Sequence, residues 1–258
     1  MSRRPPAAFL TATLTGREWL TSRLVRVTLE GPELTGLRVT EPASSIRVLL
    51  PEPGRSGPLE MPDWDGNRFV YPGGRRPTIR TLTPRRHQPE PGVLQVDVVV
   101  HGAGAAALWA ATAAEGTPAA VSGPARGYSL DPEATRLVLG GDETAVAAIS
   151  QIVETSPGDL ELDVHVETGA ADARPPLPSH PRSRIRWVTT DGRLPGQALV
   201  EQLADVEIPE GTRMWVAGEA AAMQRLRQRT FTERGVPRSR VTIRGYWKHG
   251  RSAEAGAG

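Results

Sequence analysis

"LVLGGDETAVAAI", residues 137–149, is typical of a buried strand, a pair of glycines and the start of a helix. Glycines let the backbone turn sharply, and the amide groups at the start of a helix can receive a phosphate. Acidic residues in the first helical turn have a second explanation, since they cap the helix and interact favourably with its dipole. The stretch therefore predicts a strand–turn–helix unit and leaves two roles open for its acids, helix capping and nucleotide binding.

The same arrangement returns in "MWVAGEAAAMQRLR", residues 214–227, and the whole chain after residue 131 alternates strands with helices. Such alternation indicates a parallel sheet with helices on both faces. Two glycine turns at one edge of a parallel sheet suit a ligand that lies across that edge. The pair favours a nucleotide, and the residues predicted to border it are Gly141, Asp142, Glu143, Thr144, Gly218 and Glu219.

The chain up to about residue 125 has a different rhythm, with short alternating segments broken by glycine and proline. The expected strands are 8–19, 24–31, 45–52, 78–86, 93–102 and 117–125. This spacing predicts a small antiparallel barrel. The fold class is therefore a two-domain β plus α/β protein, with a small antiparallel β-barrel over 1–130 and a parallel α/β domain of nucleotide-binding type over 131–258.

Two segments interrupt the strands of the first domain. Residues 52–77 form a loop rich in Pro, Gly and Asp that is too long for a plain connection, which indicates a lid or an insertion. Residues 103–116 predict a short helix with Leu108, Trp109 and Ala111 on its buried side.

Composition excludes several classes of protein. The 258 residues contain no cysteine, and the five histidines lack metal-ligand spacing, so we expect no metal site and any redox chemistry must come from a bound organic cofactor. The formal charge is +2, with the arginines spread among almost as many acids, which argues against a nucleic-acid partner. No apolar run is long enough to span a membrane, and the start lacks a signal-peptide core, so we expect a cytoplasmic protein without a membrane partner.

Three further stretches carry groups suited to an anionic, planar ligand. In "RTLTPRR", 80–86, strand alternation places Arg80, Leu82 and Pro84 on one side. Its arginines either grip a phosphate or a ring carbonyl through paired hydrogen bonds, or are simply solvated on an exposed strand. In "VVVHGAGAAALWA", 98–110, a strand ends at His101 before a Gly-x-Gly turn and a helix start that can hold a pyrophosphate. His101 taken alone is more typical of a structural histidine.

The last of these stretches is "RGYWKHG", residues 244–250. It places Tyr246 and Trp247 beside Lys248, the only lysine of the chain. The aromatic pair either closes a core or shields a planar cofactor ring, and Lys248 is either ordinary surface charge or an anion contact.

Taken together, these motifs resemble the siderophore-interacting protein family, flavin-dependent ferric-siderophore reductases related to the ferredoxin-reductase fold. The resemblance runs from about residue 10 to residue 250. "RTLTPRR" resembles the family's R-x-Y-T-x-R flavin strand, and "HGAGAAALWA" is similar to H-G-x-G-P-A-S-x-W-A, its flavin pyrophosphate turn. "SGP", "GDETAVAAI", "WVAGE" and "GYWKHG" follow in the family's order.

The resemblance implies a barrel that holds FAD, a second domain that receives NADH or NADPH, and electron delivery to a bound ferric siderophore or other small-molecule substrate. Arg80, Leu82 and Thr83 would then lie against the flavin, and Tyr246 and Trp247 near its isoalloxazine. Lys248 and Arg244 would face an anionic siderophore. The residues implied for the flavin pyrophosphate turn are His101, Gly102, Gly104, Ala105, Ala106 and Ala107. No catalytic residue is assigned.

The departures from the family pattern gather at the flavin site. Leu82 stands where the family has a tyrosine that packs on the flavin ring, and Ala105 and Ala107 replace the proline and serine of the phosphate turn. Loss of one hydroxyl donor costs on the order of 1 kcal/mol of cofactor affinity. These changes keep two alternatives open beside a working reductase. In the first, the scaffold serves small-molecule biosynthesis, as another flavin oxidoreductase or a redox-neutral cyclase with a weakened or lost flavin site. In the second, it binds a siderophore without turnover.

The sequence does not choose between NADH and NADPH. Glu167 at a strand end suits a ribose hydroxyl, whereas Arg174 in the following loop suits a 2′-phosphate.

Overall fold

The computed structural model describes residues 7–52, 57–100, 102, 104–125 and 127–250. The chain divides into two compact units, each with its own sheet. The first comprises residues 1–19 and 25–127, and the second comprises 20–24 and 128–258. His101 and Ala103, which fall in the expected pyrophosphate turn, lie outside the described residues. The predicted boundary at residue 130 and the ligands assigned to each domain stay predictions.

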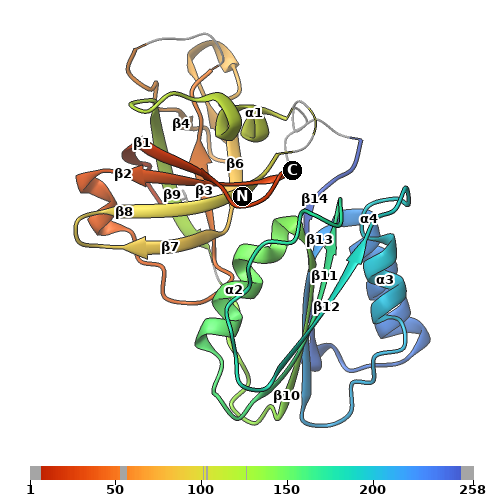
Figure 1. Ribbon diagram of the computed structural model, residues 1–258. Coiled ribbons are helices and arrows are strands. Elements are labelled where there is room, and N and C mark those ends of the chain that lie inside the picture. Colours follow the sequence, from red (N-terminus) through yellow and green to blue (C-terminus); the bar gives the residue numbers. More distant parts are fainter. Residues whose placement is uncertain (1–6, 53–56, 101, 103, 126, 251–258) are drawn as a thin grey trace. The chain divides into compact units, whose positions relative to one another are not determined.

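The first unit is built on one antiparallel sheet of seven strands (Figure 1). In sequence these are β1 (Leu10–Trp19), β2 (Leu24–Glu30), β3 (Ser45–Leu49), β6 (Ile79–Leu82), β7 (Pro84–Gln88), β8 (Val93–Val99) and β9 (Pro118–Ala125). Their order across the sheet is β6-β3-β9-β1-β2-β8-β7. The two edge strands, β6 and β7, are therefore consecutive in the chain.

This order explains how the barrel closes. The chain leaves β6 at one edge and enters β7 at the other with only Thr83 between them. The expectation of one continuous strand over 78–86 is wrong, since Thr83, Pro84 and Arg85 are buried in succession instead of alternating between two faces. A second irregularity lies between Pro84 and Arg86 in the pairing with β8. Proline has no N–H for a ladder, and a bulge bends the strand that carries it.

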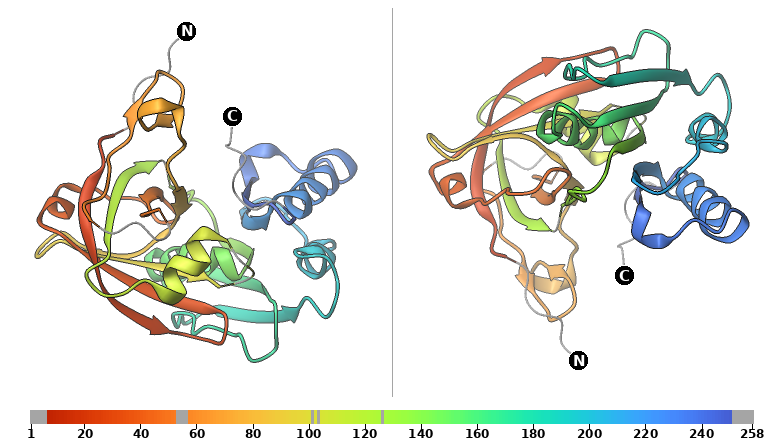
Figure 2. Two further views of the ribbon diagram at one scale, coloured as in Figure 1. Left: turned by 90° about the horizontal axis from the view of Figure 1, so that it is seen from above. Right: turned by 90° about the horizontal axis from the view of Figure 1, so that it is seen from below.

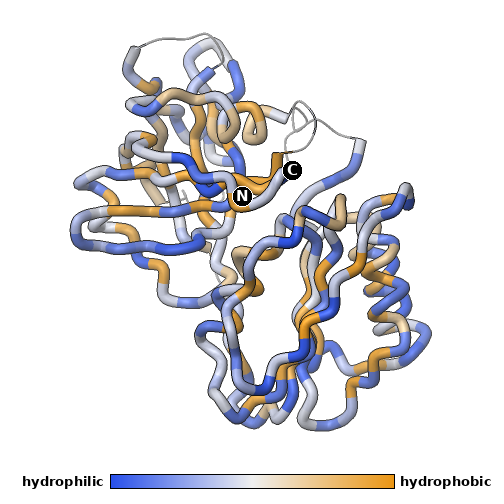
Figure 3. The backbone as a smooth tube through the Cα atoms, in the orientation of Figure 1, coloured by the Kyte–Doolittle hydropathy of each residue, from blue (hydrophilic) through white to orange (hydrophobic). Residues whose placement is uncertain are grey.

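The strands curve around one apolar core (Figure 2). Inward residues such as Leu14, Val27, Val48 and Val96 are fully buried and alternate with more exposed ones. In Figure 3 hydrophobic segments accordingly follow the strands of both units, while many of the connecting loops are hydrophilic. Alternation of this kind is the physical basis of a half-buried antiparallel strand.

Helix α1 (Ala105–Thr112) covers part of this core, but with a different side than the sequence suggested. Ala107, Trp109 and Ala110 are buried, whereas Leu108 is 51% exposed. The prediction that Leu108 faces the core is therefore wrong. A short helix of alanines has almost no amphipathic pattern, so its orientation is decided by the fit of Trp109 into the barrel core.

The segment predicted as a loop or insertion holds a small sheet of its own. Strands β4 (Asp63–Trp64) and β5 (Phe69–Val70) pair antiparallel, and one turn of 3-10 helix, η2 (Pro72–Gly74), follows. Another 3-10 turn, η1 (Pro32–Gly36), packs against β1.

The second unit has a parallel sheet of five strands in the order β12-β11-β10-β13-β14. The strands are β10 (Arg136–Asp142), β11 (Glu161–Thr168), β12 (Ser183–Thr189), β13 (Thr212–Glu219) and β14 (Val241–Trp247). The helices are α2 (Val146–Thr155), α3 (Gln197–Leu203) and α4 (Ala220–Arg227), with shorter turns η3 (Glu143–Ala145), η4 (Gln228–Glu233) and η5 (Arg238–Arg240). The predicted parallel sheet is confirmed.

The helices cover both faces of this sheet (Figure 1). Helices α3 and α4 contact each other and share a core with Val138 and Val216, while α2 packs on the opposite face against β10. The chain winds outward from β10 to β12 on one side and continues from β13 to β14 on the other. The strand order thus reverses between β10 and β13, and open α/β sheets bind ligands in the crevice at such a reversal.

Candidate functional site

The start of α1 is open to a ligand. Among the described residues no side chain caps this helix, and its first backbone hydrogen bond runs from Leu108 N to Gly104 O at 2.9 Å. The amides of the preceding first-turn residues, Ala105, Ala106 and Ala107, have no partner within the helix. Ala105 and Ala106 are half-buried, whereas Ala107 is buried.

The two glycines before this helix leave room at its end. A Cβ on Gly102 or Gly104 would meet no heavy atom of a described residue within 4 Å. By contrast, a Cβ on Gly31 would lie 2.5 Å from a backbone oxygen, and one on Gly92 would lie 2.4 Å from another. Glycines that packing does not require, beside uncapped helix amides, form the cradle that a pyrophosphate needs. The residues present therefore fit the FAD implied by the family resemblance.

The arginine strand contributes three predicted flavin contacts. Arg80 on β6 is half-buried, and one of its guanidinium nitrogens donates to Ile79 O at 2.9 Å. Leu82 is half-buried and packs against the barrel core, and Thr83 is buried where the chain passes between the two edge strands. The roles of Arg80, Leu82 and Thr83 toward a flavin stay predictions.

In the second unit, Asp142 lies where the strand order reverses. Its carboxylate is 7% exposed and accepts from Thr144 N at 2.9 Å, from the Thr144 hydroxyl, and from Trp247 Nε1 at 2.7 Å. Burial raises the pKa of the Asp142 carboxyl, although these hydrogen bonds oppose the rise. Of the two roles left open by the sequence, Asp142 fills the capping role.

Its neighbours in the turn are also used by the fold. Glu143 is buried and accepts from Arg23 Nε at 3.0 Å within the second unit. A Cβ on Gly141 would lie 2.4 Å from Ala145 Cβ, so this glycine lets the helix start pack on its own strand. Thr144 is the one member of the turn from Gly141 to Thr144 that is half-buried instead of buried.

The turn after β13 repeats this pattern. Glu219 is 4% exposed, and its carboxylate accepts from Ala222 N at 2.8 Å, which caps α4, and from His249 N at 3.2 Å. A Cβ on Gly218 would lie 2.8 Å from Asp142 Oδ2. Gly218 is therefore needed because the Asp142 carboxylate lies over it.

Glu167 at the end of β11 completes a row of capping carboxylates. It is 3% exposed and accepts from Gly196 N at 2.6 Å and from Leu199 N at 2.8 Å, which caps α3. Burial raises the pKa of the Glu167 carboxyl, and the nearby Asp142 adds to the rise. The suggestion that Glu167 accepts from a ribose hydroxyl is wrong in this structure, because both its oxygens face helix amides inside the protein. Arg174 is exposed in the following loop.

The helix starts at this edge thus differ from the start of α1. Asp142, Glu219 and Glu167 accept from Thr144 N, Ala222 N and Leu199 N, so one amide at each of these helix starts already has a partner within the chain. The roles of Gly141, Asp142, Glu143, Thr144, Gly218 and Glu219 toward a nicotinamide nucleotide stay predictions.

The C-terminal stretch lies over the end of β13. Tyr246 is half-buried and its ring meets Trp215 edge to face, with centroids 6.3 Å apart. Trp247 is half-buried, Lys248 is exposed, and Arg244 is half-buried on β14. The structure therefore brings Trp247 together with Asp142, Gly218 and Glu219, which the sequence had assigned to a different ligand.

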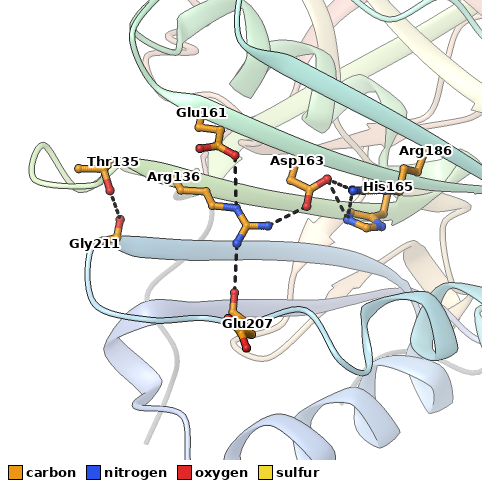
Figure 4. Close-up of polar contacts among 8 residues, drawn as sticks. All are labelled: Thr135, Arg136, Glu161, Asp163, His165, Arg186, Glu207 and Gly211. Atoms are coloured by element: carbon orange, nitrogen blue, oxygen red, sulfur yellow. Dashed lines mark hydrogen bonds and ion pairs between the residues drawn. The ribbon is translucent and has the colours of Figure 1, made fainter.

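A separate polar cluster lies on strands β10, β11 and β12, away from the turn that holds Asp142 (Figure 4). Asp163 is buried and pairs with Arg136 at 2.8 Å, with Arg186, and with His165 Nε2 at 3.2 Å. Burial opposes ionisation, but His165 and the two guanidinium groups lower the pKa of Asp163 below its usual value. Burial also lowers the pKa of His165. The described residues contain no group of side chains suited to a metal ion.

An antiparallel barrel followed by a five-stranded parallel sheet with helices on both faces is a ferredoxin-reductase-like fold. Solved reductases of 16–19% identity share this fold. Residues 13–128 match the siderophore-interacting FAD-binding domain and residues 134–250 match the siderophore-interacting protein domain. The chain belongs to the siderophore-interacting protein family.

Individual relatives agree with this assignment. Ferric vibriobactin reductase ViuB of Vibrio cholerae is 29% identical over 93% of this chain and 89% of its own length. A siderophore utilization protein from T. fusca is 32% identical, with a TM-score of 0.84 over 98% of this chain and 97% of that one. The siderophore-interacting protein SipS from Aeromonas hydrophila is 26% identical, with a TM-score of 0.77 over 97% and 95%. In the part of the chain that the structure describes, no helix is long and apolar enough to cross a membrane.

Proposed function

We propose that this protein is a flavin-dependent reductase of ferric siderophores. The observation that carries the proposal is the uncapped start of α1 beside Gly102 and Gly104, within a segment that matches a siderophore-interacting FAD-binding domain. The name of the relative from Vibrio cholerae supports the substrate class. A cytoplasmic location remains part of the proposal.

Bound FAD would supply the redox chemistry, since it takes up two electrons and can deliver them singly to iron(III), which weakens the hold of hard oxygen ligands on the metal. The chain's own part is binding and orientation. The α1 amides receive the pyrophosphate, Arg80 provides a fixed cation beside it, and Leu82 offers an apolar surface in place of an aromatic face. Lys248 and Arg244 provide positive charge for an anionic chelate.

NADH or NADPH is the electron donor that we propose, by analogy with reductases of this fold. Because Asp142, Glu167 and Glu219 each accept from an amide at a helix start of the second unit, those amides are not free for the nucleotide's phosphates.

The test begins with the absorption spectrum of the purified protein before and after incubation with FAD and gel filtration. We expect retained flavin bands, and then reduction of a ferric tris-catecholate when NADH or NADPH is added. A second assay with dithionite as reductant separates failure of the donor from failure of the flavin site. A protein that retains no flavin under any of these conditions contradicts the proposal.

One observation favours a second candidate, a family scaffold that serves other small-molecule chemistry. Leu82 is packed against the barrel core and Ala107 is buried, so two positions that differ from the family pattern are already satisfied without a ligand. Binding of an apolar organic ligand by protein that retains no flavin would support this candidate over the reductase.

A further inference from the structure

The buried acids Asp142 and Glu219 share a feature that helix capping does not require. Each caps a helix start with one carboxylate oxygen and uses the other oxygen to hold the end of β14 or the residues just after it. Asp142 Oδ2 accepts from Trp247 Nε1 at 2.7 Å, and Glu219 Oε1 accepts from His249 N at 3.2 Å. Glu167 caps α3 with both of its oxygens and makes no such contact in the described structure.

The backbone between these groups is shaped for the contact. Strand β14 is shifted against β13 so that Gly245 pairs with Gly218 and Trp247 pairs with Glu219, which leaves Tyr246 as an extra residue. A bulge of this kind re-aims the side chains that follow it. Gly218 has no side chain because the Asp142 carboxylate fills that space, with 2.8 Å between Oδ2 and an ideal Cβ.

The result is a short segment fixed at two points on either side of Lys248. Trp247 is fixed by its indole N–H, His249 by its backbone N–H, and their rings meet edge to face with centroids 6.2 Å apart. Lys248 lies between them with its side chain exposed. A hydrogen bond that an indole N–H donates to a buried carboxyl oxygen fixes the ring more firmly than a solvated contact does.

We propose that Asp142 and Glu219 are positioning residues for the substrate site: they fix the Trp247–His249 segment and thereby present Lys248 to an anionic ferric chelate. The inference rests on the proposed function for its ligand. Asp142 and Glu219, which were predicted from the sequence to lie beside a nucleotide, would then support the segment that faces the substrate.

The test uses full-length protein and the gallium(III) complex of an anionic tris-catecholate, which is not reduced and so reports binding alone. We expect Asp142→Asn, Glu219→Gln and Trp247→Phe each to weaken chelate binding about tenfold, and Lys248→Ala to do the same. Asp142→Asn leaves one oxygen for the donors of Thr144 and Trp247, and Trp247→Phe removes the indole donor, so both weaken the same contact and the double variant should bind no more weakly than either single one. Glu167→Gln is the matched control, a buried capping acid without a contact to the segment, and should bind within about twofold of wild type.

A spectroscopic readout separates positioning from general loss of structure. In a ¹H–¹⁵N spectrum the Trp247 indole signal, identified by its absence in Trp247→Phe, should shift in Asp142→Asn while most other indole signals remain. An unchanged Trp247 signal in Asp142→Asn, or equal loss of binding in Glu167→Gln, overturns the inference. If wild type itself binds no gallium chelate but the Trp247 signal shifts as expected, the substrate assignment fails while the fixing of the segment stands.

Discussion

The helix start at Ala105 and the helix starts at Glu143 and Ala220 look alike in sequence, each a glycine turn after a strand, yet they end in opposite states. Before α1 the glycines have open space at their Cβ positions, and no described side chain caps the helix. Before η3 and α4 the glycines are required by packing. The Asp142 and Glu219 carboxylates accept hydrogen bonds from amides at these two helix starts.

The difference teaches that a glycine turn predicts an anion site only where the helix amides have no hydrogen-bond acceptor from the chain itself. A carboxylate one residue before the helix supplies the anion from within the chain, and this internal anion needs no ligand. The alanines after Gly104 cannot supply one, so a phosphate from outside would be the partner there.

The largest effect on stability is expected when Gly141→Ala is compared with Gly104→Ala. The new Cβ at 141 would lie 2.4 Å from Ala145 Cβ and 3.1 Å from Ala217 O, so we expect a loss of about 3 kcal/mol in the free energy of unfolding. Gly104 has φ −65° and open space, so its substitution should change that free energy by no more than about 0.5 kcal/mol. Denaturant unfolding measures both, and equal losses would remove the contrast.

A second test uses pH to compare two buried carboxylates of the second unit. Asp163 has a folded-state pKa below the ordinary 3.8, so its stabilising contribution is present above that value and is lost as pH falls. Asp142 has a raised pKa, so its contribution is greatest below 3.8 and decreases as pH rises through the folded-state pKa.

We therefore expect Asp163→Asn to cost about 2 kcal/mol at neutral pH and progressively less in acid, because Arg136 and Arg186 lose their counter-ion. The stability difference between wild type and Asp142→Asn should move the other way, becoming less favourable to wild type as pH rises. Thermal unfolding of the three proteins between about pH 3 and 7 gives the two slopes. If the stability difference between wild type and variant changes with pH in the same direction for Asp163→Asn and Asp142→Asn, the arginines do not distinguish the two carboxylates.

The smallest expected effect concerns the open turn. Ala107→Ser restores a hydroxyl near the uncapped amides, and one additional hydrogen bond of about 1 kcal/mol should tighten FAD binding about fivefold. Ala111→Ser, on the last turn of the same helix, is the control and should leave the affinity unchanged. Quenching of flavin fluorescence on titration gives both dissociation constants, and a weaker affinity in Ala107→Ser would argue that no flavin phosphate lies at this turn.

Much of the fold could be read from local pattern. Alternating apolar residues before residue 125 and alternating strands and helices after residue 131 predicted the barrel and the parallel sheet, because side-chain period and element length are local properties. The motif order also predicted the family, which the domain matches confirm.

Other features escaped prediction because they depend on residues distant in sequence. The bend at Thr83 exists because β6 and β7 are opposite edges of one sheet, which no pattern within 78–86 records. Leu108 is exposed because Trp109 fits the barrel core, and a run of alanines gave no periodic signal to say so.

The sequence by itself determined the two sheets, the family and the presence of acids in the glycine turns. Only the tertiary structure decided what those acids do, since Asp142 meets Trp247 across 105 positions of the chain and Glu167 meets Gly196 across 29. The physical reason is that a buried carboxylate must find hydrogen-bond donors, and which donors reach it depends on how the strands and helices pack together.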